Sequence, residues 1–299
     1  MISALRTPDD AFAHLPGYDF SPHYLDHANG LRMHYVDEGI QDDAAAPLFL
    51  CLHGQPSWSY LYRKMIPHFA AHGRVIAPDL FGFGKSDKPV EQDIYSFEFH
   101  RASLMHIIET LNLTKITLVC QDWGGLLGLT LPMAMPERFD RLIVMNTAFP
   151  TGEHDLGPGF QMWKAYNRAN PDMDLTALFH RGTPILSEAE AAAYAAPYPD
   201  VRYKAGVRQF PELVPDRLDA PGADIGRAAR DWFRDQWTGE TFMAVGGADP
   251  VITPDAMAHL RTQIRNCPEP LIIPEAGHFV QEWGDQVAPA ALRHFGLIS

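Results

Sequence analysis

The sequence predicts an α/β protein in which helices cover both faces of a mostly parallel sheet. Short apolar runs of strand length recur along the 299 residues, and helical patterns alternate with them. A strand that is buried on both faces appears in the sequence as a continuous apolar run, and the alternation of strand and helix is typical of parallel sheets. Hydrophobic residues make up 46% of the chain, which is enough for a large core.

The strands of the sheet are predicted from apolar runs that are bounded by turn residues. Segment 31–36 comes first and alternates between apolar and polar residues, so we expect it to be an antiparallel edge strand. The buried parallel strands follow at 47–52, 74–77, 115–120, 141–145, 241–245 and 270–273.

Helical patterns lie between these runs, with apolar residues at helical spacing. We expect helices at 60–71, 98–111, 124–135, 254–264 and 286–295.

The alternation stops in the segment 151–221, which is rich in Ala, Tyr and Pro and has no clear strand. Helix-like pieces occur there at 159–169 and 187–196. We therefore expect three parts. The first part of the α/β core is 1–150, an inserted helical cap domain over the carboxyl edge of the sheet is 151–221, and the second part of the core is 222–299.

The charge and composition exclude several classes of partner. The formal net charge is -13, whereas nucleic acids and anionic membrane surfaces need a basic protein surface. No apolar run has the length of a membrane-spanning helix, and the first residues do not resemble a signal peptide. We expect a cytoplasmic monomer.

The odd number of cysteines, three, predicts free thiols rather than a disulfide framework. No metal-ligand spacing occurs in the sequence, so we expect no metal or cofactor.

A tight turn follows the strand at 115–120 and precedes an apolar helix. Its residues are Gln121-Asp122-Trp123-Gly124-Gly125, with Asp122 between the small residues Cys120 and Gly124. This spacing is typical of a nucleophile elbow, whose strained backbone lifts the central side chain clear of the sheet. The same residues also fit an aspartate that caps a helix, so the turn alone leaves both interpretations open.

An aspartate in the elbow changes the chemistry that a serine would perform. Serine attacking an alkyl halide would give an ether, which has no carbonyl for water to attack. Aspartate gives an ester, which water can hydrolyse. An aspartate is ionised at neutral pH without help, so a base is needed only in the second step.

Two further residues complete a triad in the order nucleophile, acid, histidine. Asp249 follows the strand at 241–245, and His278 follows the strand at 270–273. Ligand sites in open α/β sheets lie at the carboxyl ends of strands. His278 would take a proton from the water that attacks the Asp122 ester, and Asp249 would orient the imidazole. The backbone N–H groups of Gln55, in His53-Gly54-Gln55-Pro56, and of Trp123 are expected to form an oxyanion hole.

At these residues the chain resembles the haloalkane dehalogenases of the α/β-hydrolase superfamily, and it is similar to the subfamily with two halide-binding tryptophans. The resemblance implies the α/β-hydrolase fold with an eight-stranded sheet and a helical cap. It also implies hydrolysis of haloalkanes to a primary alcohol, halide and a proton through an alkyl-aspartate ester. The motifs that carry it are His53-Gly54-Gln55-Pro56-Ser57-Trp58-Ser59-Tyr60-Leu61-Tyr62-Arg63-Lys64, Gln121-Asp122-Trp123-Gly124-Gly125 and Ala276-Gly277-His278-Phe279-Val280-Gln281-Glu282.

The resemblance also implies the binding residues. Trp123 and Trp163 would bind the halide, and an indole N–H suits this role because it only donates hydrogen bonds. The strand that ends at Met145-Asn146-Thr147 offers no carboxylate, which supports Asp249 as the acid. The apolar wall of the substrate pocket is expected at Leu126, Phe160, Phe210, Pro211, Val214, Val251 and Ile252.

The sequence departs from the family pattern at two of these positions. Gln55 stands where Glu or Asn is common, and its side chain is expected to position the hydrolytic water or to contribute to halide binding. Leu126 replaces a bulkier aromatic residue and allows longer haloalkanes.

Other functions remain open. An epoxide hydrolase would share the aspartate and the elbow and would use tyrosines of the cap, where Tyr166, Tyr194, Tyr198 and Tyr203 occur. A fluoroacetate-type dehalogenase typically has Arg after the nucleophile, where this chain has Trp123. A non-catalytic receptor on the same fold would not need a complete triad.

Overall fold

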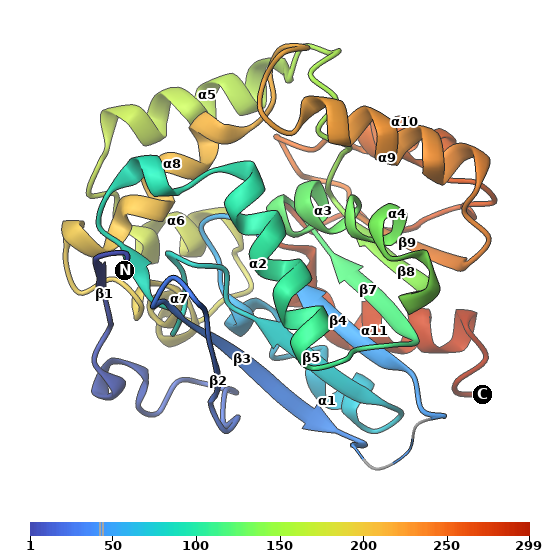
Figure 1. Cartoon of the computed structure of the whole chain (residues 1–299), viewed down its shortest axis with the longest axis horizontal. Coiled ribbons are helices and arrows are strands. Elements are labelled where there is room, and N and C mark those ends of the chain that lie inside the picture. The colour runs from blue at the N-terminus through green and yellow to red at the C-terminus, as the bar shows by residue number, and fades with distance from the viewer. Residues whose placement is uncertain (42, 44) are drawn as a thin grey trace.

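An eight-stranded sheet forms the centre of the molecule, in the order β10-β9-β8-β7-β4-β5-β3-β2 (Figure 1). The computed structural model describes all residues except 42 and 44. The strands are β2 (His23–Asp26), β3 (Arg32–Gly39), β4 (Leu48–Leu52), β5 (Arg74–Pro78), β7 (Ile116–Cys120), β8 (Phe139–Met145), β9 (Glu240–Gly246) and β10 (Leu271–Ile273). A separate two-stranded ribbon pairs β1 (Ala4–Leu5) with β6 (Lys88–Pro89).

The register of the parallel strands brings their carboxyl ends together. Leu52 of β4 pairs with Cys120 of β7, and Cys120 pairs with Val144 of β8. Every residue of β4 and β7 is buried, as their continuous apolar sequences predict. The loops that follow these three strands therefore start side by side at one edge of the sheet.

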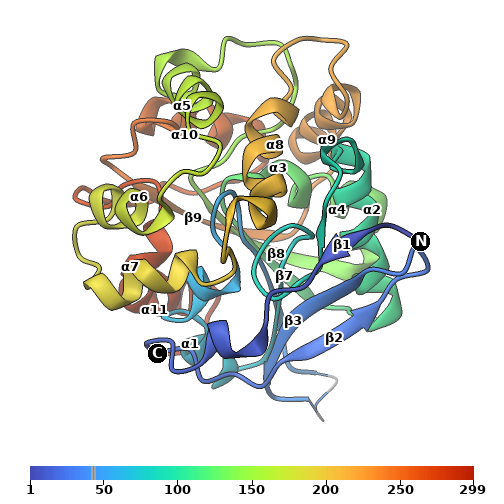
Figure 2. The same ribbon diagram turned by 90° about the vertical axis from the view of Figure 1, so that its left-hand side faces the viewer.

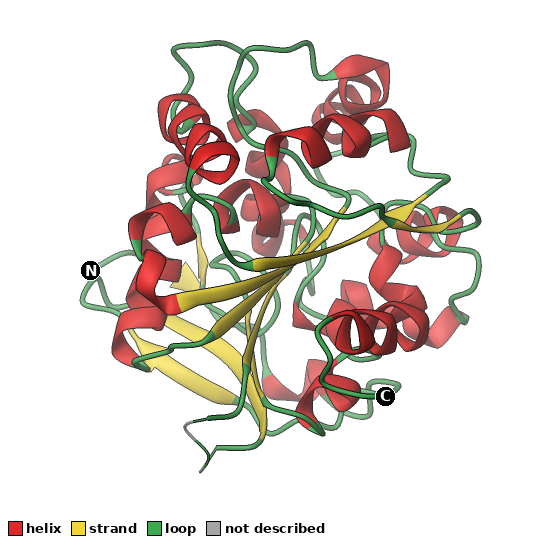
Figure 3. Cartoon of the chain, turned by 90° about the vertical axis from the view of Figure 1, so that its right-hand side faces the viewer, coloured by secondary structure: helices red, strands yellow, loops and turns green. Residues whose placement is uncertain are grey.

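Helices cover both faces of the twisted sheet, as Figure 3 shows. Helices α1 and α11 pack together on one face, and the other face carries α2, α3, α4, α9 and α10. The bounds are α1 (Ile66–Ala70), α2 (Phe97–Thr110), α3 (Trp123–Gly128), α4 (Leu131–Ala134), α9 (Ala223–Asp235), α10 (Pro254–Gln263) and α11 (Gly284–His294).

Only helices and loops lie between β8 and β9. Besides α9, this segment contains α5 (Gly157–Ala169), α6 (Leu175–Gly182), α7 (Glu188–Ala195) and α8 (Ala205–Leu213). Helix α5 packs against α8, and α6 packs against α7. Figure 2 shows these four helices, coloured lime to gold, gathered beside the sheet. The remaining helical turns are 3₁₀ helices: η1 (Asp9–Phe12), η2 (Ser59–Tyr62), η3 (Gln92–Ile94), η4 (Pro136–Arg138), η5 (Val201–Lys204) and η6 (Val280–Trp283).

The mostly parallel, eight-stranded sheet confirms the predicted fold class, and four details differ from expectation. Strand β3 is antiparallel but is not an edge strand, because β2, a polar segment that no apolar run marks, pairs outside it. The helix expected at 60–71 divides into η2 and α1. The helix expected at 124–135 divides into α3 and α4, since Pro132 has no N–H to donate to the carbonyl four residues earlier. Helix α9 was not expected.

The three cysteines are free, as predicted; Cys51 and Cys120 are buried, and Cys267 is half-buried. Within the described part of the chain, no helix combines the length and the apolar character needed to cross a bilayer.

Candidate active site

The turn after β7 holds Asp122 in a conformation that few residues other than glycine adopt, with φ 51° and ψ −128°. Gly124 allows this turn, because a Cβ there would lie 1.9 Å from the carbonyl oxygen of Leu52. The hydroxyl of Thr147, which follows β8, donates to the carbonyl of Asp122 at 2.8 Å. The elbow therefore depends on close approach of three neighbouring strand ends.

One oxygen of the Asp122 carboxylate is held by the loop after β4. The backbone N–H of Gln55 donates to Oδ1 at 2.7 Å. Gly54 makes room for this contact, since a Cβ at that position would lie 2.1 Å from Oδ1. The loop is fixed by His53, whose Nδ1 lies 2.8 Å from the carbonyl of Gly54 and whose Nε2 accepts from the N–H of Leu80 at 2.9 Å. Burial lowers the pKa of His53, so the ring stays neutral.

The other oxygen of Asp122 faces His278. The Nε2 atom of His278 lies 3.4 Å from Oδ2, and its Nδ1 atom lies 2.8 Å from Oδ2 of Asp249. The structure thus brings together the three residues that the sequence predicts for the triad, from the ends of β7, β9 and β10. Gln121 also contacts His278, with its Nε2 atom 3.0 Å from the ring Nε2.

Asp249 is buried and accepts hydrogen bonds on both carboxylate oxygens. The N–H groups of Val251 and Ile252 donate to Oδ1 at 2.8 and 3.1 Å. The side chain of Asn146 donates to Oδ2 at 3.0 Å. Burial favours the neutral acid, but His278 and the N–H groups of Val251 and Ile252 outweigh it and lower the pKa of Asp249.

Asn146 is a site residue that sequence reasoning missed. Besides Asp249, its amide donates to the carbonyls of Gly246 and Ile252, and its Oδ1 accepts from the N–H of Gly246. The side chain is fully buried at the end of β8. Its position after a strand was a signal, but the sequence could not show which carboxylate it would hold.

The two carboxylates change the charge of the histidine between them. Burial disfavours the imidazolium, but the neighbouring Asp249 and Asp122 outweigh this effect and raise the pKa of His278 to about 10. An ester on Asp122 would have no negative charge, so the pKa of His278 would then fall. Alkylation of Asp122 would therefore favour the neutral ring that can accept a proton.

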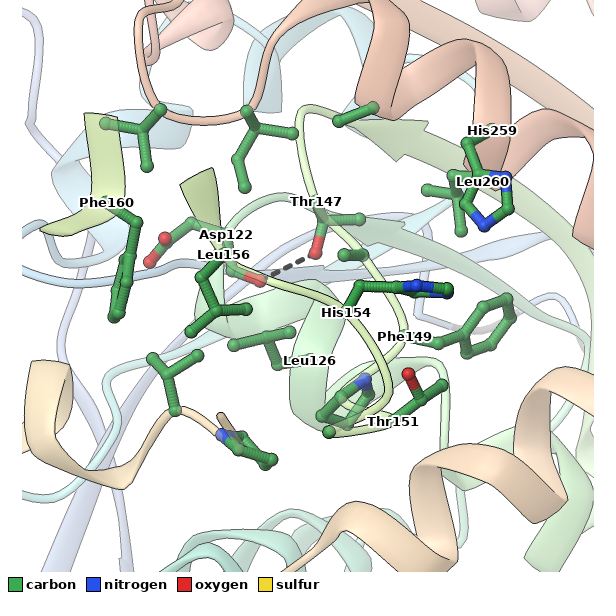
Figure 4. Close-up of a pocket in the computed structure, with 18 of the residues that line it drawn as sticks. Asp122, Leu126, Thr147, Phe149, Thr151, His154, Leu156, Phe160, His259 and Leu260 are labelled. Carbon is green, nitrogen blue, oxygen red and sulfur yellow. Dashed lines mark hydrogen bonds between the residues drawn. The ribbon is translucent and has the colours of Figure 1, made fainter. Parts of the chain in front are cut away.

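Asp122 opens into a cavity of about 220 Å³ that is walled mainly by apolar side chains. Figure 4 shows Asp122 and Phe160 at one end of this pocket, and His154 and His259 at the other. Its apolar lining residues include Leu126, Phe149, Leu156, Phe160, Val214, Val251, Ile252 and Leu260. The described residues contain no group of three His, Cys, Asp or Glu side chains that could hold a metal ion.

The predicted pocket residues do not all line this cavity. Leu126, Phe160, Val214, Val251 and Ile252 do. Phe210 and Pro211 do not, because Phe210 instead packs on the ring of Trp123 with centroids 4.8 Å apart.

The two predicted halide ligands lie outside the lining of this cavity as well. Trp123 is buried beside Asp122, and Trp163 is half-buried on α5, three residues after Phe160. Neither indole N–H donates a hydrogen bond to another described residue.

The four tyrosines of the cap segment do not line the cavity either. The hydroxyl of Tyr194 donates to Glu282, Tyr198 is buried, Tyr203 is half-buried, and Tyr166 is exposed. This placement does not favour the epoxide hydrolase alternative, which requires tyrosines that reach the electrophile.

A buried ion pair joins two of the sequence motifs. Arg63, after η2, donates to both oxygens of Glu282 at 2.6 and 2.9 Å, and Lys64 lies 3.0 Å from the same carboxylate. Glu282 is in η6, just after His278. Sequence reasoning named both motifs but could not pair them.

Comparisons with known proteins agree with this geometry. Residues 47–285 match the family model of the alpha/beta hydrolase fold. A haloalkane dehalogenase of Psychrobacter cryohalolentis is 45% identical over 96% of each chain. The chain belongs to the haloalkane dehalogenases. A haloalkane dehalogenase of Mycolicibacterium paratuberculosis is 41% identical over 94% of each chain. The tetrameric structure of haloalkane dehalogenase DpaA from Paraglaciecola agarilytica superposes with a TM-score of 0.96 at 48% identity, covering 99% of this chain and 100% of that one.

Haloalkane dehalogenases are hydrolases that act on carbon–halide bonds, and this family membership confirms the fold and the reaction class predicted from the elbow and its neighbours.

Proposed function

We propose that Asp122 is the nucleophile of this haloalkane dehalogenase. The observation that carries the proposal is the chain of contacts from Asp249 through His278 to Asp122 beside an apolar cavity. The Gln55 N–H holds Oδ1, which leaves Oδ2 to attack the halogen-bearing carbon. A C–O bond forms, the carbon–halogen bond breaks, and halide leaves with the bonding electrons.

The second step hydrolyses the ester. His278 Nε2 takes a proton from water, and the resulting oxygen attacks Cγ of Asp122. The negative charge that develops on Oδ1 is stabilised by the N–H of Gln55, with the N–H of Trp123 as the expected second donor. The intermediate collapses with cleavage of the bond between Cγ and the alkyl oxygen. The alkoxide takes the proton of the added hydroxyl, so the alcohol leaves and the carboxylate is restored. Asp249 stabilises the imidazolium until its proton passes to solvent. These residues supply the nucleophile, the base and the oxyanion donors.

The halide is proposed to bind between Trp123 and Trp163. Neither indole N–H has another described hydrogen-bond partner, and a donor-only group favours an anion that has left carbon. This assignment would place the chain in the two-tryptophan subfamily.

The segment 151–221 is proposed to act as the cap. It contributes Phe160 and Val214 to the cavity wall above Asp122, so substrate would bind between it and the sheet edge. The described residues that line the cavity include no Lys or Arg to pair with a carboxylate substrate, which favours a neutral haloalkane. A cytoplasmic location and a monomeric state remain predictions. The tetrameric relative makes size-exclusion chromatography the appropriate check of the second.

The proposal predicts that the purified protein releases halide and acid from 1,2-dibromoethane or 1-bromobutane without added metal or cofactor.

Replacing Trp163 with Phe keeps an aromatic ring but removes the donor to halide, and should reduce the dehalogenation rate at least about tenfold. A halide assay with parallel styrene oxide hydrolysis measures this. Styrene oxide turnover without halide release from any haloalkane would instead support an epoxide hydrolase.

The role of His278 as the base predicts different pH sensitivities for the two steps. Alkylation of Asp122 needs no base, whereas ester hydrolysis needs neutral His278, whose fraction falls as the pH falls below the pKa that the ring has beside the uncharged ester. In rapid-quench experiments, the first equivalent of halide should appear at a nearly constant rate while alcohol formation slows toward low pH. An alcohol-forming step that keeps the same rate at every pH at which the enzyme stays folded would contradict the role of His278 as base.

A further inference from the structure

One backbone carbonyl inside α8 lacks its usual partner. The carbonyl of Val207 would accept a hydrogen bond from the N–H four residues later, but that residue is Pro211, which has no N–H. Val207 is buried, so water cannot readily replace the missing donor. A carbonyl in this situation needs donors from elsewhere in the protein.

Two buried amide side chains supply those donors. Gln55 Nε2 and Asn167 Nδ2 each donate to the Val207 carbonyl at 2.9 Å. A carbonyl oxygen has two lone pairs and can accept both. Only 5% of Gln55 and 2% of Asn167 is exposed, so these bonds do not compete with solvent.

The three residues belong to different parts of the site. Gln55 follows β4, and its own N–H holds Oδ1 of Asp122. Asn167 is on α5, four residues after Trp163 and so on the same face of that helix. Val207 is on α8, whose Phe210 packs against Trp123.

We propose that the two hydrogen bonds to the Val207 carbonyl, together called the joint, hold α5 and α8 in position over Asp122. Gln55 and Asn167 are positioning residues that act through this carbonyl. Gln55 connects the nucleophile with the cap, since its backbone N–H orients the Asp122 carboxylate and its side chain holds α8. The proposal rests on the proposed function in one respect, that Asp122 is the nucleophile. In this proposal the main role of the Gln55 side-chain amide is to hold Val207, instead of the water positioning or halide binding expected from the sequence.

The identity of residue 55 follows from this joint. The amide of glutamine both reaches the carbonyl and donates to it. Asparagine is one methylene shorter, and an ionised glutamate has no proton to donate. A glutamate at this position could donate to Val207 only when it is protonated.

Gln55→Glu and Gln55→Met therefore make a diagnostic pair. Both should lower kcat/KM about tenfold near pH 8, because the loss of one buried hydrogen bond shifts the cap. With the wild type as reference at each pH, the Glu variant should recover as the pH falls and the carboxyl becomes protonated. The Met variant has nothing to protonate, so its ratio should stay constant. Gln286→Met, the same change at an exposed position on α11, should match the wild type.

Equal ratios for the Glu and Met variants at every pH, or a Met variant as active as the wild type, would overturn the coupling to Asp122. The joint itself is tested without activity by urea unfolding of Gln55→Met, Asn167→Leu and the double variant. Each single variant leaves one donor on the carbonyl, whereas the double variant leaves it buried and unpaired. The midpoint should therefore fall further in the double variant than the sum of the two single losses, and additive losses would overturn the joint. If the wild type released no halide, the proposed function would fail while this unfolding result still decided the joint.

Discussion

Replacing Asp249 with Asn should lower kcat by about 10³-fold to 10⁴-fold without unfolding the enzyme. The N–H groups of Val251 and Ile252 fix one side-chain oxygen, so the new amide nitrogen must replace Oδ2. That nitrogen would face two donors, Asn146 Nδ2 and His278 Nδ1. His278 can relieve this conflict only by moving its proton to Nε2, and that tautomer cannot accept a proton from water.

Stopped-flow or steady-state halide assays at saturating haloalkane measure this loss. Asp255→Asn is the matched control, because Asp255 is exposed in the first turn of α10 and should tolerate the change. Ester formation should survive in Asp249→Asn, since the nucleophile is untouched. A variant that retains more than about a tenth of the wild-type kcat would exclude Asp249 as the partner of the base.

Replacing Glu282 with Gln should reduce the free energy of unfolding by roughly 3 kcal/mol. The carboxylate is fully buried and contacts Arg63, Lys64 and the hydroxyl of Tyr194. The amide has no charge to offset the buried guanidinium, and its NH₂ group would face another donor. Among the described residues, Glu190, at 2.8 Å, would then be the one carboxylate left to pair with Arg63. Because Tyr194 is on α7, the loss would also weaken the contact between α7 and the loop that carries His278.

Urea unfolding followed by circular dichroism gives the change in free energy. Glu137→Gln removes a carboxylate that is 71% exposed and lies 3.8 Å from Arg138, so it should change stability by less than about 0.5 kcal/mol. Equal stability of the two variants would show that the buried pair does not hold the motifs together.

The parts of the site that could be predicted from the sequence are those fixed by local chain geometry. A strand, a tight turn with glycines and a helix determine the exposure of Asp122, and those residues are adjacent in the chain. Asp249 and His278 each follow an apolar run, and the carboxyl ends of parallel strands must share an edge. The order of strands and the position of the turn therefore sufficed to place these three side chains together.

The remaining parts depend on contacts between distant segments. Asn146 and Asp249 are neighbours only because β8 pairs with β9, and Arg63 meets Glu282 across the junction of η2 and η6. Phe210 was expected in the pocket wall, but the course of α8 directs it onto Trp123. Strand β2 is polar and half-buried, so it lacks the apolar run by which the other strands were found.

The central claim is that Asp122 supplies the oxygen of the alcohol, and a single turnover in H₂¹⁸O tests it most directly. With enzyme in excess over 1-bromobutane, the account predicts an alcohol that carries ¹⁶O and an Asp122 carboxylate that gains ¹⁸O from the hydrolytic water, both measured by mass spectrometry. An alcohol that carries ¹⁸O in the first turnover would show direct attack by water on the haloalkane and would contradict the ester intermediate.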